Sequence, residues 1–482
     1  MIKPNKYQEQ IFDFIINKKG NTVVQAVAGS GKTWTIVEAT KLIPPNQSAI
    51  FVAFNRSIAN ELKKKLPSHV KAQTLHGVGY SMFFSNAPEQ KEVNESKLRT
   101  IIEESFQNSS KEKKVFMREI IPLIKATLCN VNVDDIMDLA EEYNVANFDV
   151  INESTIKSIN LVLRKCKEHK TIDYDDMIWI PIVKGFKGRK YDWVFVDEVQ
   201  DLNRAQLELI KKICNGNTRI IAVGDSRQSI YAFRGADTNS INNFKEYFNA
   251  GELPLSICYR CPKKVIDLAQ TIVPEIEAPS TALDGKVNRV YSDEFNLCNI
   301  EHGDLILCRT NAPLIETAFA LIRQHKKVVV RGRDIGKNIL NIANKFDCKS
   351  LEELITQIMR AKDRQQSILI KIEDLRNKAE QKARAMRLID IYDTILAISE
   401  NANTLDDFRH VITDLFSDRE EGIICSSVHK AKGLEYDTVY ILDYNTLMPH
   451  PMAETQKELE QENNIKYVAI TRAKKELNLI YN

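Results

Sequence analysis

The stretch Thr22–Trp34, TVVQAVAGSGKTW, places the strongest constraint on how this chain can fold. Thr22–Val27 is a short apolar run rich in β-branched residues, which is typical of a buried strand. Trp34–Leu42 can form a helix, and small residues followed by Lys32 and Thr33 lie between the two segments. A strand, a small-residue loop and a helix in this order predict a phosphate-binding loop, because backbone N–H groups and the helix N-terminus point at an anion.

The loop carries the residue types that nucleotide phosphates require. The Lys32 ammonium can reach the terminal phosphates, and the Thr33 hydroxyl can hold Mg²⁺. The first position of the usual pattern is a glycine, whereas this chain has Ala26, so the pattern is relaxed by one methyl group. The residues expected to surround the phosphates are Ala28, Gly29, Ser30, Gly31, Lys32 and Thr33.

Length and composition limit the classes of protein that need to be considered. A chain of 482 residues predicts about three or four domains. The formal charge of +2 neither demands nor excludes nucleic acid, because a local basic groove matters more than the total charge. No apolar run reaches about 18 residues, so no membrane span is expected. A polar N-terminus without a signal peptide and nine scattered cysteines indicate reduced thiols and a cytoplasmic location.

Two further strands deliver polar residues suited to phosphoryl transfer. The strand predicted at Trp193–Val196 is followed at once by Asp197 and Glu198. The first carboxylate can hold Mg²⁺, and the second can take the proton from an attacking water. A strand at Arg219–Val223 leads to Gln228, which is a candidate sensor of the γ-phosphate.

Other residues could complete a nucleotide site. Gln8 can offer a donor and an acceptor to the edge of a purine, although a solvated helix start is the simpler alternative. Near Gly251 the chain is predicted to cross into a second domain. There Tyr259 can stack on adenine, and Arg260 can stabilise charge on the transferred phosphoryl group.

Aromatic residues near strand ends are candidates for binding exposed bases. Strands are predicted at Ala49–Phe54 and Val70–Thr74, and parallel sheets bind ligands at the carboxyl ends of their strands. Phe54 is either a core residue or a stacking platform. Tyr231 and Phe233 are further candidates for stacking on bases.

Two segments differ from the rest of the chain in composition. They are rich in charged residues, and their apolar residues occur at helical spacing. Residues 81–170 and 334–419 are therefore predicted to be helical insertions. Within the second segment, regular spacing from Ile368 to Ile389 predicts one long helix, which either packs within its own small domain or joins a coiled-coil partner.

Ten short motifs occur in a fixed order from Asn5 to Lys475, and together they resemble the UvrD/Rep-type superfamily 1A DNA helicases. The motifs are PNKYQ, AVAGSGKT, VAFNRSIANEL, TLHG, VDEVQD, VGDSRQSIYAFRGA, CYR, CRTNA, SSVHKAKGLEYD and YVAITRAKK. The details are most similar to the F-box DNA helicase branch of that family. No N-terminal segment is expected to serve as an F-box, so that partner function is not expected.

The resemblance implies an α/β fold of two RecA-like P-loop motor domains with parallel sheets, each with a mostly helical insertion. The expected order is motor domain 1A in residues 1–80 and 171–250, insertion 1B in 81–170, motor domain 2A in 251–333 and 420–482, and a reduced insertion 2B in 334–419.

The resemblance also implies ATP and Mg²⁺ as cofactors and assigns roles by position. Adenine would be held by Gln8 and Tyr259, Mg²⁺ by Thr33 and Asp197, and the ribose would lie near Glu435. Glu198 would be the general base, Gln228 the sensor, and Arg260 and Arg472 arginine fingers that complete the catalytic set with Lys32. The implied single-strand path is lined by Phe54, Asn55, Thr74, His76, Tyr231, Phe233, Arg234, Arg309, Asn311 and His429.

The implied function is an ATP-dependent 3′–5′ single-stranded DNA translocase and DNA helicase in repair, recombination or replication. A monomer acting on single strands and single-strand/duplex junctions is expected, with no membrane partner. One alternative is a translocase that mainly displaces proteins from single strands, which the short second insertion favours. Another is a nucleotide-gated DNA-binding module, although Glu198 and the two candidate arginine fingers argue against it.

Overall fold

The computed structural model describes residues 3–90, 92–143, 145, 147–230, 240–371, 378–416 and 421–482. The chain forms two compact units. Unit 1 contains residues 1–27 and 31–256, and unit 2 contains residues 28–30 and 257–482. Among the described residues, no helix is both long enough and apolar enough to cross a membrane.

Unit 1 is built on a six-stranded sheet in the order β3-β2-β6-β7-β1-β8. Every strand pairing in this sheet is parallel. The strands are β1 (Asn21–Ala26), β2 (Ala49–Ala53), β3 (Val70–Thr74), β6 (Tyr191–Val196), β7 (Cys214–Gly224) and β8 (Ala250–Leu255). All five residues of β2 are buried, which is typical of a parallel sheet covered on both faces.

Alternating side chains of these strands fill two separate cores. The rings of Phe51, Trp193 and Phe195 stack with centroids 6.2–6.3 Å apart in one core. The intervening residues of β2 and β6 point to the other face, as the period of two requires. The helices that alternate with these strands along the chain are α1 (Lys6–Asn17), α2 (Lys32–Thr40), α3 (Arg56–Lys65), α4 (Leu75–Asn86), α9 (Tyr174–Val183), α10 (Arg204–Lys212) and α11 (Ser240–Phe248).

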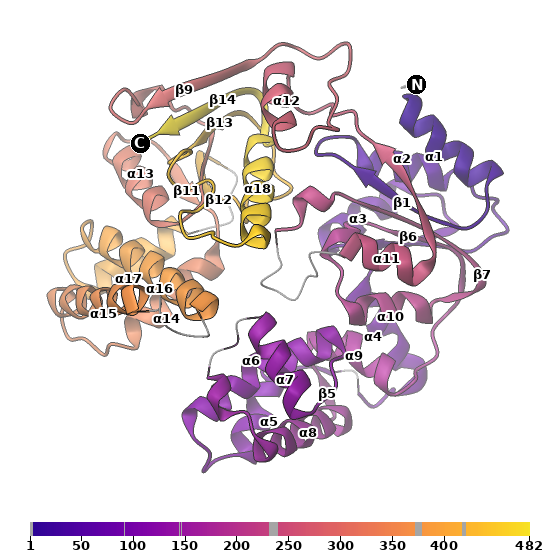
Figure 1. The fold of residues 1–482 in the computed structure, drawn as a ribbon, viewed down its shortest axis with the longest axis horizontal. Coiled ribbons are helices and arrows are strands. Elements are labelled where there is room, and N and C mark those ends of the chain that lie inside the picture. Colours follow the sequence, from indigo (N-terminus) through magenta and orange to yellow (C-terminus); the bar gives the residue numbers. More distant parts are fainter. Residues whose placement is uncertain are drawn as a thin grey trace. The chain divides into compact units, whose positions relative to one another are not determined.

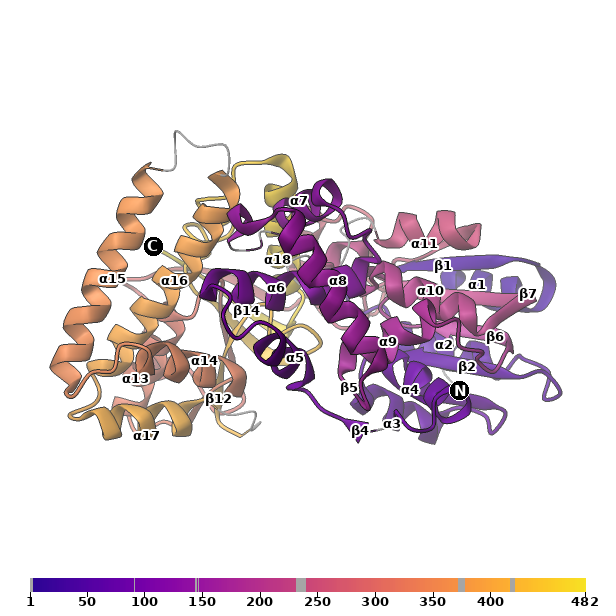
Figure 2. The same cartoon turned by 90° about the horizontal axis from the view of Figure 1, so that it is seen from below.

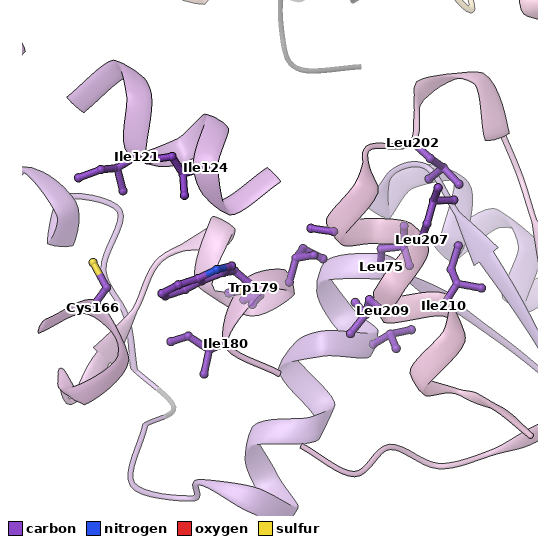
Figure 3. Packing of buried hydrophobic residues seen from close by; sticks show 14 of the residues in the cluster. Leu75, Ile121, Ile124, Cys166, Trp179, Ile180, Leu202, Leu207, Leu209 and Ile210 are labelled. Carbon is purple, nitrogen blue, oxygen red and sulfur yellow. The ribbon is translucent and has the colours of Figure 1, made fainter. Parts of the chain in front are cut away.

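The second core continues from the sheet into a group of helices between α4 and α9. These are α5 (Lys97–Ser105), α6 (Lys111–Thr127), α7 (Val133–Glu142) and α8 (Glu153–Glu168), which lie together in Figure 1. They are flanked by the short parallel pair β4 (Glu92–Val93) and β5 (Thr171–Ile172). Figure 3 shows Ile121 and Ile124 of α6 near Trp179 of α9, and Leu207 and Leu209 of α10 near Leu75. Helix α4 itself ends at Asn86, whereas the insertion was expected to begin at residue 81.

A buried ionic cluster fastens these helices to α9. The Lys97 ammonium lies 2.5 Å from Asp176 Oδ2, and the Lys125 ammonium lies 2.9 Å from Asp176 Oδ1 and 3.2 Å from Asp173 Oδ2. Asp173 and Asp176 also form the capping box of α9. Burial acts to raise the pKa of Asp176, but Lys125 and Lys97 outweigh it and hold the pKa below its ordinary value. The same two carboxylates therefore begin α9 and neutralise two buried lysines.

Replacing Asp176 by asparagine should destabilise the protein by about 3 kcal/mol, because it leaves buried ammonium groups without their partner. Since the pKa of Asp176 is lowered on folding, its stabilising effect is present above the unfolded value of about 3.9 and is lost as the pH falls through the folded value. The free energies of unfolding in urea of wild type and Asp176→Asn should differ most between pH 5 and 7 and converge in acid.

Glu61→Gln, which removes an exposed ion pair with Lys65, is the control, and its free energy of unfolding should change little. Equal losses in the two variants would contradict the role of the cluster.

Unit 2 contains a second six-stranded sheet in the order β11-β12-β10-β13-β14-β9, again with parallel pairings throughout. The predicted fold class, α/β with two parallel sheets, is therefore confirmed. The strands are β9 (Lys286–Tyr291), β10 (Leu305–Cys308), β11 (Val328–Val330), β12 (Ile423–Ser427), β13 (Tyr436–Ile441) and β14 (Ala473–Tyr481). Along the chain, these strands alternate with the helices α12 (Lys263–Gln270), α13 (Ala312–Arg323) and α18 (Gln456–Ile470).

The described residues between β11 and β12 include the helices α14 (Arg333–Asn344), α15 (Leu351–Lys371), α16 (Lys378–Ser399) and α17 (Leu405–Leu415). Helices α15 and α16 lie side by side in Figure 2 and pack against each other. The prediction of one long helix from Ile368 to Ile389 is therefore wrong. The apolar spacing is the same in one helix and in two helices of a hairpin, so it cannot reveal where the chain reverses.

The boundary between the units differs from the expected one. Strand β8 pairs with β1 over its whole length and belongs to the sheet of unit 1. The expected start of the second motor domain at residue 251 therefore lies inside a strand, and the change of unit follows Ser256.

Candidate active site

The phosphate-binding loop has the predicted strand–loop–helix form, from the end of β1 at Ala26 to the start of α2 at Lys32. Gly29 and Gly31 have φ values of +67° and +77°, a backbone conformation that side chains with a Cβ rarely adopt. Gly31 precedes α2 and makes no side-chain cap. The first N–H groups of α2 are thus left for another acceptor, as an anion site requires.

The Lys32 side chain lies among carboxylates at the ends of neighbouring strands. Its ammonium is 3.2 Å from Glu198 Oε1. Burial acts to lower the pKa of Lys32, but Glu198, Asp225 and Asp197 raise it above its ordinary value. Lys32 therefore keeps its positive charge in a site that is largely closed to water.

The two adjacent carboxylates follow β6, as predicted. Burial, together with the negative charge of Glu198, raises the pKa of Asp197 to about 7. Glu198 has a φ of +52°, which is uncommon for a residue other than glycine. This backbone turn accompanies the contact of its carboxylate with Lys32.

A buried hydrogen-bond chain links Glu198 to Gln228. The Gln200 amide donates to Glu198 Oε2, and its Oε1 accepts the backbone N–H of Asp225 at 3.0 Å. Asp225 Oδ2 in turn accepts from Gln228 Nε2 at 2.6 Å. Burial raises the pKa of Asp225 to about 6. Gln200 and Asp225 lie within two of the quoted motifs, but sequence reasoning gave them no role because only the fold brings them together.

Gln8 is joined to the helix that follows the loop. It is 4% exposed, its Nε2 donates to Thr35 Oγ1 of α2 at 3.0 Å, and its Oε1 accepts the Asn5 N–H at 3.0 Å. The simpler alternative, a solvated helix start, is therefore wrong. The amide is held in one orientation beside α2, as recognition of a purine edge would require.

The donors near Lys32 fit a divalent cation. The Glu198 carboxylate contacts the Lys32 ammonium, and the charges of Asp225 and Asp197 also act on it, so a dication would reduce the excess of negative charge. Thr33 is half-buried at the start of α2. In the part of the chain that the structure describes, no group of three or more His, Cys, Asp or Glu side chains could hold a metal by itself. This donor set suits Mg²⁺, which binds through one or two carboxylates together with phosphate oxygens and water.

Four of the residues expected to line the path of single-stranded DNA lie at the carboxyl ends of β2 and β3. These two β-strands are neighbours in the sheet. Phe54 is 49% exposed, so the core alternative is wrong for this side chain. Asn55 and Thr74 cap α3 and α4 through their side-chain oxygens. The His76 ring meets the Tyr174 ring edge-on with centroids 6.1 Å apart, and burial lowers the pKa of His76.

Three further path candidates, Tyr231, Phe233 and Arg234, lie outside the described residues.

In unit 2 the predicted nucleotide residues divide into an exposed group and a buried one. Tyr259 is 51% exposed, and Arg260 Nε lies 2.7 Å from Glu435 Oε2. Arg472 is only 1% exposed. Its guanidinium donates to the carbonyl of Val468 at 2.8 Å and to Leu434 O and Thr471 Oγ1 at 3.1 Å each. The donors of Arg472 thus hold unit 2 together, and its role as a finger stays a prediction.

Two other predicted residues are also engaged within unit 2. The Arg309 guanidinium contacts both oxygens of the buried Glu462 carboxylate, with Nη2–Oε1 at 2.7 Å. Asn311 donates its backbone N–H and its side-chain amide to the two oxygens of Asp390, at 3.0 and 2.9 Å. His429 is half-buried after β12. Sequence reasoning missed Glu462 and Asp390, because isolated acids on helices resemble ordinary solvated positions.

Two family models match the chain. The model for the UvrD/REP helicase N-terminal domain matches residues 5–249, and that for the UvrD-like helicase C-terminal domain matches residues 422–480. The first match spans β1, β2, β3, β6 and β7 of the unit 1 sheet, and the second spans β12, β13 and most of β14 of the unit 2 sheet.

Curated relatives match along nearly the whole chain. F-box DNA helicase protein 1 of Schizosaccharomyces pombe is 25% identical, and the alignment covers 98% of this chain and 57% of that protein. ATP-dependent DNA helicase PcrA of Staphylococcus aureus is 23% identical over 96% of this chain and 81% of its own length. F-box DNA helicase 1 of Gallus gallus is 23% identical, with 98% and 48% covered. The chain thus spans about half the length of the F-box relatives.

A solved helicase structure, Arterivirus nonstructural protein 10, covers 99% of this chain and 62% of its own at 12% identity. Its TM-score of 0.36 is too low to bear on the fold.

Gly224→Ala should lower ATP turnover about tenfold, because a Cβ there would collide with Gln200 Oε1 and would lie 2.7 Å from Val199 Cγ1. Displacing Gln200 breaks a buried hydrogen bond, which costs about 1–3 kcal/mol when its partner is left unsatisfied. Gly216→Ala is the matched control, since it lies in the same strand and its Cβ would meet nothing within 4 Å. Steady-state ATP hydrolysis and the melting temperature should be measured for both. A normal rate in Gly224→Ala would show that the Gln200 link is dispensable.

Proposed function

Because the chain belongs to the UvrD/REP helicase family, we propose that it is an ATP-dependent 3′–5′ single-stranded DNA translocase and DNA helicase. Support comes above all from the half-buried Lys32 ammonium, which follows a glycine-containing loop, contacts Glu198 and is affected by the charges of Asp225 and Asp197. This arrangement has the charges needed for Mg²⁺ and the phosphates of ATP. We place its biological use in DNA repair, recombination or replication.

Each residue of the nucleotide site has a distinct proposed task. Lys32 holds the terminal phosphates, and Thr33 and Asp197 hold Mg²⁺, which supplies charge neutralisation at the transferred phosphoryl group. Glu198 orients the attacking water and takes its proton. A phosphate beside Lys32 competes for the ammonium that now contacts Glu198, so nucleotide binding frees this carboxylate for the water.

The hydrogen-bond chain gives hydrolysis a way to reach the strand path. Gln200 joins Glu198 to Asp225, and Asp225 holds Gln228. Gln228 precedes Tyr231 by only two intervening residues. A change at the γ-phosphate can therefore alter the backbone that leads into the proposed stacking residues.

The proposed nucleotide contacts of unit 2 are Tyr259 with adenine, Glu435 near the ribose, and Arg260 and Arg472 with the phosphates. The Arg260–Glu435 pair supports this grouping, because it joins two of these residues directly. The proposed substrates are single strands and single-strand/duplex junctions, bound by a monomer. Bases would pass Phe54, whose exposed ring follows β2.

Lys32→Ala and Glu198→Gln should separate binding from hydrolysis. The first should abolish both ATP binding and turnover, since it removes the phosphate-binding cation. The second should keep binding and reduce turnover by at least about 100-fold, because general base catalysis typically contributes 10²–10⁴. Lys41→Ala removes an exposed lysine just after α2 and is the matched control. Binding of a fluorescent ATP analogue and steady-state hydrolysis should be measured together. Wild-type turnover in Lys32→Ala would rule out this site.

Polarity and coupling require nucleic-acid substrates. Single-stranded DNA should stimulate ATP hydrolysis, and the stimulation should fall as salt rises, because phosphate contacts release counterions. Duplexes with a 3′ tail should be unwound, and those with a 5′ tail should not. Preference for the 5′ tail would contradict the proposed direction. A rate that is indifferent to DNA would contradict the proposed substrate but leave the nucleotide site intact.

A further inference from the structure

Helix α4 carries aromatic side chains that are half-buried or exposed. His76, Tyr80 and Phe84 recur every four residues, which places them along one face of the helix. The rings of Tyr80 and Phe84 meet edge-on with centroids 5.2 Å apart, and Phe84 is 53% exposed. Tyr174, at the start of the adjacent helix α9, is also exposed and meets His76 edge-on. We call these four residues the aromatic ridge.

Helix α4 is anchored mainly by residues outside the ridge, and of the ridge residues on this helix Tyr80 packs partly against the core. The opposite face of the helix is already buried through Leu75, Val78, Met82 and Phe83. Exposed aromatic side chains gathered in this way mark an interaction surface more often than a structural one.

A cationic segment lies beside the C-terminal end of the ridge. Residues 184–190, KGFKGRK, contain four cations and no acid. The Asn86 side chain exchanges two hydrogen bonds of 3.0 Å with the backbone of Lys187, and the rings of Phe83 and Phe186 meet edge-on with centroids 5.3 Å apart. The cations are therefore fixed next to α4 rather than on a distant loop.

Lys71 of β3 extends this positive charge along α4. It points to the same side of β3 as Gln73, whose amide donates to Ser81 Oγ of α4 at 2.8 Å. Burial, together with the positive charges of Arg189 and Lys63, lowers the pKa of Lys71. Within the described residues, no ion pair involves Lys71, Lys187 or Arg189. A polyanion would neutralise these positive charges.

We propose that the aromatic ridge, bordered by Lys71, Lys187 and Arg189, is an additional binding surface for single-stranded DNA. It continues the strand path from His76 along α4. The inference rests on the proposed function, and it adds Tyr80, Phe84 and Tyr174, which the family motifs do not assign. Bases stack on the exposed rings, while the cations contact the phosphates. A single strand is the occupant because the bases of a duplex are already stacked on one another.

The length of the bound oligonucleotide distinguishes the aromatic ridge from the single-strand path proposed above. Full-length protein should be titrated with fluorescent oligothymidine of about 8 and about 20 nucleotides, spanning the usual range of single-strand sites. Phe84→Ala should weaken binding of the longer strand about tenfold, as expected for the loss of one stacked base, and leave the shorter strand nearly unchanged. Phe84→Trp should restore binding, because it keeps a stacking ring. Ile16→Ala, an exposed apolar truncation on α1, is the control for the alanine variant.

Charge provides a second test that does not depend on Phe84. Lys187→Glu with Arg189→Glu should weaken binding of the longer strand and reduce the dependence of its affinity on salt, because fewer phosphates are contacted. Lys18→Glu with Lys19→Glu makes the same change in charge at two neighbouring exposed residues and should have little effect. Unchanged circular dichroism and melting temperature would show that each variant is folded.

The outcomes separate this inference from the proposed function. Wild-type affinity for the longer strand in Phe84→Ala and in the doubly charged variant would overturn the surface while leaving the function intact. Failure of the wild-type protein to bind either strand would overturn both. Tighter binding of oligouridine than of oligothymidine, lost in Phe84→Ala, would overturn the assignment to DNA. A loss confined to the longer strand, reversed by Phe84→Trp, is the result that we expect.

Discussion

The ion pair between the half-buried Lys32 ammonium and Glu198 is the interaction on which the candidate site depends. Removing a charge from water is costly unless it is paired, and here one cation faces Glu198, Asp197 and Asp225. The negative charges keep Lys32 protonated, and Lys32 in turn lowers the cost of ionising the carboxylates. Burial still raises the pKa of Asp197 to about 7 and that of Asp225 to about 6. The carboxylates outnumber the single ammonium at this site. A bound dication would therefore add positive charge that the protein itself does not supply.

The parallel topology explains how residues about 165 positions apart create that imbalance. In the order β6-β7-β1, the strand before the loop is separated by one strand from the strand that carries Asp197 and Glu198, and the strand between them leads to Asp225. All three strands end at the same edge, so short polar segments after each strand meet there. This part could be predicted from the sequence, because buried strands in a parallel sheet are continuous apolar runs and the polar residues begin where the runs end.

The other features of the fold and the site could not be predicted, because they depend on contacts between segments that are distant in the sequence. Gln200 is one more polar residue after a strand until the fold places its amide between Glu198 and Asp225. Strand β8 lies where a new domain was expected, because an edge strand with Gly and Pro resembles a linker. The helix pair α15 and α16 has the apolar period of a single helix. In each case the local pattern is correct, and its partner is set by tertiary structure.

The same limit applies to polar residues that serve two purposes. Arg309 and Asn311 follow β10, as path residues should, yet their side chains hold Glu462 of α18 and Asp390 of α16. Burial acts to raise the pKa of Asp390, so its carboxylate depends on the two donors of Asn311 and on the Ala312 N–H. A phosphate that approached Arg309 would compete with Glu462 for the same guanidinium. If Arg309 contacts a nucleic-acid backbone as proposed, that contact and the packing of α18 would depend on the same side chain.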